Sequence, residues 1–177
     1  MNKIGLFCAS SNNLDAIYYA EAARLGKWLA DNNKTLVYGG ANCGLMEATA
    51  KAVHENKGTV IGIVPQILFQ RNRVSDYIHV TIPCDDLNDR KQMLIDKSDV
   101  IVVMPGSVGT LDEAFTVMAA NTIGIHSKKV IFWNVNGFWN ELFVLFNALE
   151  QKGVVNKPMN DLFSVANDFN ELISIIE

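Results

Sequence analysis

The sequence predicts an α/β fold, a three-layer α/β/α sandwich with a mostly parallel, doubly wound sheet. Two observations predict it. Short runs rich in Val and Ile alternate with longer segments of helical spacing, and strands separated by helices imply right-handed crossovers in a parallel sheet. The short runs are apolar throughout, as is typical of strands covered on both faces. With 177 residues, the chain is expected to form a single domain over 1–177.

In the N-terminal half, apolar runs predict strands at 4–8, 35–38, 59–64 and 77–82. The third is closed by Pro65 and the fourth by Pro83. Helical spacing predicts helices at 14–32 and 45–57, and Gly58 is expected to be the glycine cap of the second. Residues 66–75 are the least regular and are expected to form a loop or a short helix over the sheet.

The C-terminal half continues the alternation. Residues 99–104, Asp-Val-Ile-Val-Val-Met, are the strongest strand signal in the chain, and further strands are expected at 129–135 and 162–166. Helical spacing predicts helices at 87–97, 111–122, 139–152 and 168–177, with Gly153 as the cap of the third.

The composition excludes several classes of protein. Hydrophobic residues make up 49% and charged residues 19%, which is too apolar for a disordered chain. The formal net charge is −4 without a basic block, which argues against a nucleic-acid partner. There is no apolar run of about 18 residues and the N-terminus is a poor signal peptide, so we expect no membrane partner.

The cysteines and histidines indicate neither disulfides nor a metal site. Three cysteines, an odd number without a CxxC pair, favour a reducing, cytoplasmic location. The three histidines lack zinc-site spacing, and no HExxH is present, so no metal is expected. A Cys-His nucleophile pair stays open, because its members need not be neighbours in sequence.

Two glycine-rich turns mark the expected ligand site. In an open α/β sheet, ligands bind beyond the carboxyl ends of the strands, where Ser10 and the loops 39–44 and 105–110 are expected. Both loops lead into helices, whose N-termini offer free N–H groups to a phosphate. Neither fits GxGxxG or GxxxxGK[ST], so neither a NAD site nor a P-loop is predicted. Either both loops are only tight strand-to-helix turns, or together they indicate a binding site for an anionic, nucleotide-like ligand.

The segment from Thr110 to Glu113 has two interpretations. Thr110 and Glu113 match a capping box, with the threonine at the N-cap and the glutamate at position N3. Alternatively, a carboxylate beside a phosphate loop faces the sugar or base of a nucleotide, and Asp112 or Glu113 is the candidate.

Arg90 is the second informative residue. Leu87, Arg90 and Leu94 share one helix face, so the arginine lies on the apolar stripe. It either extends its head into water or points inward at a carboxylate or anion. Lys91 is one step around the helix and reaches the same pocket mouth.

The chain resembles a known family at these residues. Arg90-Lys91, with Met93 one position before the methionine of the motif, and the segment from Pro105 to Glu113 resemble the RKxxM and PGGxGTxxE motifs of the LOG ("lonely guy") family, the cytokinin riboside 5'-monophosphate phosphoribohydrolases. Ser107 occupies the position of the second glycine of PGGxGTxxE. The likeness runs from about residue 3 to about residue 150 and includes Val37-Tyr38-Gly39-Gly40.

The resemblance implies a Rossmann-like, nucleotide-binding homodimer that hydrolyses the N-glycosidic bond of adenine-type nucleoside 5'-monophosphates. The products are the free base and ribose 5-phosphate, and no cofactor is needed. The implied catalytic residues are Arg90 and Glu113, and Arg90 is expected to keep Glu113 ionised by lowering its pKa. The expected substrate contacts are Ser10, Gly40, Gly44, Lys91, Gly106, Ser107, Val108, Gly109, Thr110 and Asp112.

Two other functions are considered. Molybdenum-cofactor carrier proteins have a similar fold, so a non-catalytic nucleotide or cofactor binder is the alternative. The retained Arg90 and Glu113 favour the enzyme. Many members of the family are labelled lysine decarboxylases, but no lysine here can be picked out as the Schiff-base partner of pyridoxal phosphate.

Overall fold

The computed structural model describes residues 1–177 and contains seven strands and seven α-helices. The strands are β1 (Lys3–Phe7), β2 (Thr35–Tyr38), β3 (Thr59–Pro65), β4 (Val80–Cys84), β5 (Val100–Val103), β6 (Lys129–Trp133) and β7 (Ser164–Ala166). The helices are α1 (Ala16–Asp31), α2 (Gly44–Glu55), α3 (Gln66–Gln70), α4 (Leu87–Lys97), α5 (Val108–Thr122), α6 (Asn140–Gln151) and α7 (Phe169–Ile176). Two short 3-10 turns flank α6.

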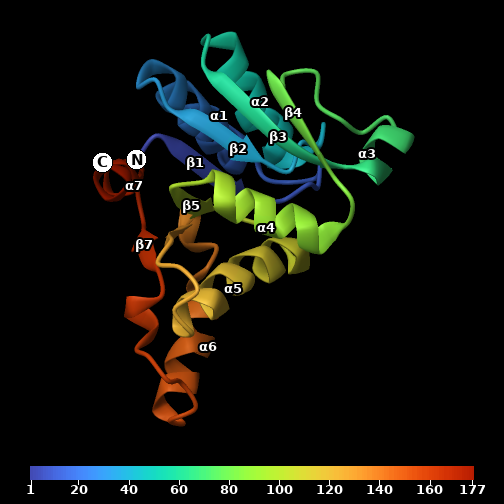
Figure 1. Cartoon of the computed structure of the whole chain (residues 1–177). Helices are drawn as coiled ribbons and strands as arrows, with labels where there is room; N and C mark the ends of the chain where they lie inside the picture. Colours follow the sequence, from blue (N-terminus) through green and yellow to red (C-terminus); the bar gives the residue numbers. More distant parts are fainter.

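All seven strands form one parallel sheet with the order β4-β3-β2-β1-β5-β6-β7. The chain starts in the middle of the sheet, builds one half up to β4 and then returns to the other side of β1 with β5. This reversal makes the carboxyl ends of β1 and β5 the switch point at which such sheets bind ligands. The predicted α/β sandwich is confirmed (Figure 1).

Two separate hydrophobic cores, one on each face, explain why the strands are apolar throughout. One core joins the sheet to α1, α2 and α7, and the other joins it to α4, α5 and α6. Neighbouring residues of one strand serve opposite cores: Leu6 packs into the first and Phe7 into the second. Both side chains are fully buried, as doubly covered strands require.

Three predictions of local structure differ from the structure in an informative way. The fourth strand begins at Val80 rather than at residue 77 and contains Pro83, which is tolerated because β4 is an edge strand with β3 as its only neighbour. The left-handed cap after α2 is Lys57 (φ +64°), and Gly58 follows it because a side chain there would collide with Ala30. Helix α5 begins at Val108, three residues before the predicted start.

Two other predictions of local structure, the bounds of α4 and the cap at Gly153, are confirmed. Helix α4 has the predicted bounds, and Gly153 has the positive φ expected of a helix cap. The three cysteines are all buried and free of disulfides. No helix of the structure combines the length and the apolar character that crossing a membrane requires.

Candidate active site

Three loops meet at the carboxyl edge of the sheet, around the switch point. The loop after β1 contacts the loop after β5, because the N–H of Ala9 donates to the carbonyl of Pro105 at 2.9 Å. The same Ala9 accepts, through its carbonyl, from the N–H of Leu45 at 3.0 Å. Main-chain hydrogen bonds therefore bring the two glycine-rich segments to one place, as the sequence predicts.

The glycines after β2 are required by the packing of these loops. A Cβ atom on Gly40 (φ +76°) would collide with Val64. A Cβ atom on Gly44 (φ +58°) would collide with the main chain of the β1 loop, and the N–H of Gly44 already donates to Oδ1 of Asn12 at 2.9 Å. Both glycines therefore have a role in folding, and Ser10, exposed beside them, remains a predicted substrate contact.

The first turn of α5, in contrast, has free main-chain donors. The N–H groups of Val108, Gly109 and Thr110 take part in no hydrogen bond of the structure; the first one along the helix runs from Leu111 to the carbonyl of Ser107. Unpaired N–H groups at a helix N-terminus, together with the helix dipole, form an anion site. The N-terminus of α5 therefore suits a phosphate better than that of α2 does.

Ser107 fits this turn although it replaces a glycine of the motif. It is the N-cap residue of α5, with φ of −115°, a conformation open to any residue, and its hydroxyl makes no capping hydrogen bond. Gly106 cannot be replaced in the same way, because a Cβ atom there would collide with the buried side chain of Thr110. Thr110 is thus inside the helix, and its predicted role as N-cap of a capping box is wrong.

Arg90 points inward, which decides between the two predicted orientations. Its Nη2 donates to the carbonyl of Gly39 at 3.2 Å, and its Nε is buried without any hydrogen-bond partner. A Cβ atom on Gly39 would overlap the guanidinium, so a glycine is needed there. The apolar stripe is shorter than predicted, because Leu94 is buried whereas Leu87 is exposed.

Glu113 is the carboxyl group of the site. Its pKa is raised from 4.5 to about 7: burial is the main cause, the charge of Arg90 opposes it, Asp112 adds to the rise and Lys91 lowers the pKa. Arg90 lowers the pKa of Glu113, as expected, but the pKa still lies above its ordinary value because desolvation outweighs the arginine charge. Arg90 and Glu113 are not in direct contact, since no nitrogen–oxygen pair between them lies within 4.0 Å.

Lys91 and Asp112 contact each other. The Lys91 Nζ lies 3.0 Å and 2.9 Å from the two carboxylate oxygens of Asp112. Each was predicted as a separate substrate contact. In the structure they form an ion pair between α4 and α5, immediately beside Arg90 and Glu113.

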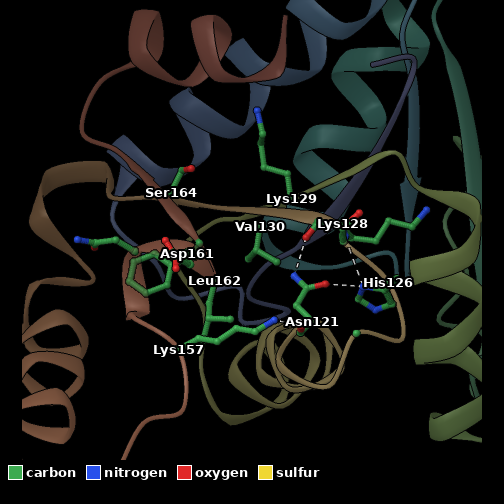
Figure 2. A pocket seen from close by; sticks show the side chains of 13 residues that line it. Asn121, His126, Lys128, Lys129, Val130, Lys157, Asp161, Leu162 and Ser164 are labelled. Atoms are coloured by element: carbon green, nitrogen blue, oxygen red, sulfur yellow. Dashed lines mark hydrogen bonds between the residues drawn. The ribbon is translucent and has the colours of Figure 1, made fainter. Parts of the chain in front are cut away.

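A hollow of about 740 Å³ lies elsewhere, at the start of β6 and β7 (Figure 2). Two of its lysines donate hydrogen bonds to main-chain carbonyls. The Nζ of Lys128 donates to the carbonyl of Ser98 at 2.6 Å, and the Nζ of Lys157 donates to the carbonyl of Asn121 at 3.1 Å. Figure 2 also shows the hydrogen bond between the side chains of Asn121 and His126. These carbonyls lie at the ends of α4 and α5, where a cation stabilises the helix dipole, so this hollow has a structural explanation.

Comparison with known proteins identifies the family. A family model described as "Possible lysine decarboxylase" matches residues 46–176. A probable cytokinin riboside 5'-monophosphate phosphoribohydrolase, LOGL2 of Oryza sativa subsp. japonica, is 33% identical over 99% of this chain and 72% of its own length. This chain belongs to the LOG family. A second LOG relative, the cytokinin riboside 5'-monophosphate phosphoribohydrolase LOG3 of Arabidopsis thaliana, is 32% identical over 99% of this chain and 81% of its own length.

Solved structures share the fold of this LOG family chain. The molybdenum cofactor binding protein of Rippkaea orientalis has a TM-score of 0.74 and 24% identity, over 99% of this chain and 94% of that one. The molybdenum cofactor carrier protein of Chlamydomonas reinhardtii has the same TM-score and the same identity, over 99% of this chain and 95% of that protein's chain. At this identity the likeness concerns the fold alone.

Two residues near the candidate site were not predicted from the sequence to be site residues. Gly39 is the partner of Arg90, and its position next to Gly40 in the loop was the available signal. Cys8, at the end of β1, has its pKa raised by burial and then by the charge of Glu113, which places its thiol near that carboxyl group. Nothing in the sequence pattern could have paired residues 8 and 113.

Proposed function

We propose that this protein hydrolyses the N-glycosidic bond of adenine-type nucleoside 5'-monophosphates, AMP or a cytokinin riboside monophosphate, to the free base and ribose 5-phosphate. One observation carries the proposal: Glu113, a carboxyl group with a pKa of about 7, lies on the helix whose N-terminal N–H groups are free. The activity for which the LOG relatives are named supports the same reaction.

The phosphate is proposed to bind at the start of α5. The free N–H groups of Val108, Gly109 and Thr110 supply donors, and the Ser107 hydroxyl supplies one more. Anchoring the phosphate there contributes binding energy remote from the reacting bond, which positions the sugar against Glu113.

Glu113 is proposed to act as the general base and then as the acid. Its ionised form removes a proton from the water that attacks the anomeric carbon, and it stabilises the positive charge of the oxocarbenium-like sugar. The same proton then passes to a nitrogen of the departing base, so water and nucleotide are converted to base and ribose 5-phosphate. A pKa of about 7 suits both steps near neutral pH.

Arg90 is proposed to bind and orient the reacting groups. Its Nε is a buried donor without a partner, so a substrate oxygen can complete its hydrogen bonding. Its charge also limits the rise in the pKa of Glu113, so that the ionised carboxylate is populated at neutral pH.

The site does not fit pyridoxal phosphate chemistry. A Schiff-base lysine must react as a neutral amine, which requires that its environment disfavour the ammonium form. The amine of Lys91, the lysine of this site, is instead occupied by hydrogen bonds to both carboxylate oxygens of Asp112. No lysine of this site therefore suits the decarboxylase chemistry that the name of the family model suggests.

A homodimer is proposed through the outer faces of α5 and α6. Val108 and Ile123, at the two ends of α5, are 82% and 74% exposed, and Val144 on α6 is 69% exposed; burying such apolar side chains against a second copy would stabilise a dimer. Light scattering should give a mass twice that of the 19.6 kDa chain, and the mass of one chain would contradict the dimer.

The reaction is tested by incubating the pure protein with AMP in water enriched in oxygen-18. Chromatography should show equal amounts of adenine and ribose 5-phosphate, with one heavy oxygen in the sugar product. AMP binding without base release would instead favour a nucleotide-binding protein.

A further inference from the structure

Two ionic residues stand next to the proposed catalytic pair without being part of it. Lys91 follows Arg90 on α4, and Asp112 precedes Glu113 on α5. The Lys91 side chain is only 15% exposed, whereas that of Asp112 is 57% exposed, so the lysine is held against the protein by its partner. Both carboxylate oxygens are within hydrogen-bond distance of the amine, at 2.9 Å and 3.0 Å.

This pair is the polar connection between the two helices. Helices α4 and α5 lie side by side on one face of the sheet, yet they touch at few points, whereas α1 and α2 pack along much of their length (Figure 1). No other hydrogen bond or ion pair joins α4 to α5. The relative position of the two helices near the site is therefore set by the apolar core that both share with the sheet and, between the helices themselves, by Lys91 and Asp112.

The catalytic residues need such a connection, because they have none of their own. Arg90 is held by Gly39 and not by Glu113, and no nitrogen–oxygen pair between the two side chains lies within 4.0 Å. A ligand can contact both only if α4 and α5 keep their spacing. Displacements of about 1 Å at a reacting group can cost a factor of about 100 in rate.

We propose that Lys91 and Asp112 form a positioning pair, which holds α4 against α5 so that Arg90 and Glu113 face one ligand. This inference rests on the proposed function. It replaces the prediction that the two residues are separate substrate contacts, since each is already occupied by the other.

The pair also balances the charge around Glu113. Lys91 lowers the pKa of Glu113 and Asp112 raises it, so together their influences oppose each other. Removing one charge leaves the other uncompensated. Lys91→Gln should therefore move the pKa of Glu113 up, and Asp112→Asn should move it down.

The first test compares charge reversals with a charge swap. Lys91→Asp and Asp112→Lys each place like charges together and should lower kcat about tenfold or more, the loss expected when a reacting group is displaced by less than about 1 Å. The double variant restores an attractive pair, so it should recover most of the loss, and Lys91→Arg should keep most of kcat. A double variant no better than either single one overturns the proposal.

The second test follows the acid limb of the kcat profile against pH. The limb should shift to higher pH in Lys91→Gln and to lower pH in Asp112→Asn, which loss of packing alone would not produce. Lys27→Gln is the matched control, because Lys27 and Asp31 form an exposed pair of the same length, 2.9 Å, on α1. Equal profiles in all variants overturn the proposal.

The proposal is tested even if the wild-type protein releases no base. In that case the proposed function fails, and the affinity for AMP replaces kcat in the swap experiment. The titration of the Glu113 carboxyl carbon, followed by NMR, replaces the pH profile. Unchanged AMP affinity in both reversals, or an identical Glu113 titration in Lys91→Gln and Asp112→Asn, overturns the positioning pair.

Discussion

The guanidinium of Arg90 lies directly on the main chain of Gly39. Its Nη2 donates to the Gly39 carbonyl at 3.2 Å, and a Cβ atom on residue 39 would occupy the same space. The end of β2 is thus shaped to receive a side chain from α4, 51 residues later in the chain. This contact fixes the arginine at the carboxyl end of β2, the strand next to the switch point.

Gly39→Ala should displace the guanidinium of Arg90 and lower kcat for base release by about 100-fold, since the guanidinium would be misplaced rather than lost. The fold should persist, because the collision involves the far end of a flexible side chain. Steady-state kinetics with AMP measures the effect.

A double-mutant cycle on thermal unfolding provides the control. In the Arg90→Ala background the new methyl group has room, so Gly39→Ala should cost less stability than in the wild type. Equal costs in both backgrounds would show that Arg90 is not what Gly39 accommodates.

Gly109→Ala should separate ligand binding from folding. A Cβ atom on Gly109 meets nothing within 4 Å, and alanine is the better helix former, so Tm should stay the same or rise. A phosphate bound to the first turn of α5 would meet the methyl group, and AMP affinity should fall about tenfold, a loss of roughly 1.4 kcal/mol. Calorimetry with AMP measures it.

Adenosine is the matched ligand, because it lacks the phosphate. Its affinity should be the same for Gly109→Ala and the wild-type protein. If AMP and adenosine lose affinity equally, or neither does, the phosphate does not bind at this turn.

Glu113→Gln should stabilise the protein at alkaline pH. The folded pKa of Glu113, about 7, is above its ordinary value of 4.5, so the folded wild type loses stability as the pH rises through that window. Glutamine does not titrate. The advantage of Glu113→Gln should therefore grow between pH 4.5 and 7, to at most roughly 3 kcal/mol. Denaturant unfolding at pH 5 and pH 8 measures it, and an advantage that does not change with pH contradicts the buried carboxyl.

The sequence predicted the architecture well because its signals are local. The bounds of α4 follow from helical spacing after Asp86, whose side chain caps the helix as an N-cap aspartate should. The strands were found because burial on both faces makes them apolar throughout. The residues after the strands were expected at one edge, and the loops after β1, β2 and β5 do meet there.

The errors arose where tertiary contacts outweigh local signals. Thr110 and Glu113 match a capping box, yet α5 starts earlier because Thr110 packs on Gly106 and is buried within the first turn. The pKa of Glu113 was expected to be low, because a sequence shows a neighbouring arginine motif but not desolvation. The pairing of Lys91 with Asp112 joins residues 21 positions apart and has no sequence signature.

The most direct test of the account measures base release from AMP by the wild-type protein and by Glu113→Ala, with AMP affinity determined for both. The account predicts that the wild type releases adenine, whereas Glu113→Ala binds AMP with similar affinity and releases none above the background rate. Unchanged release by Glu113→Ala would remove this residue from the mechanism and contradict the account.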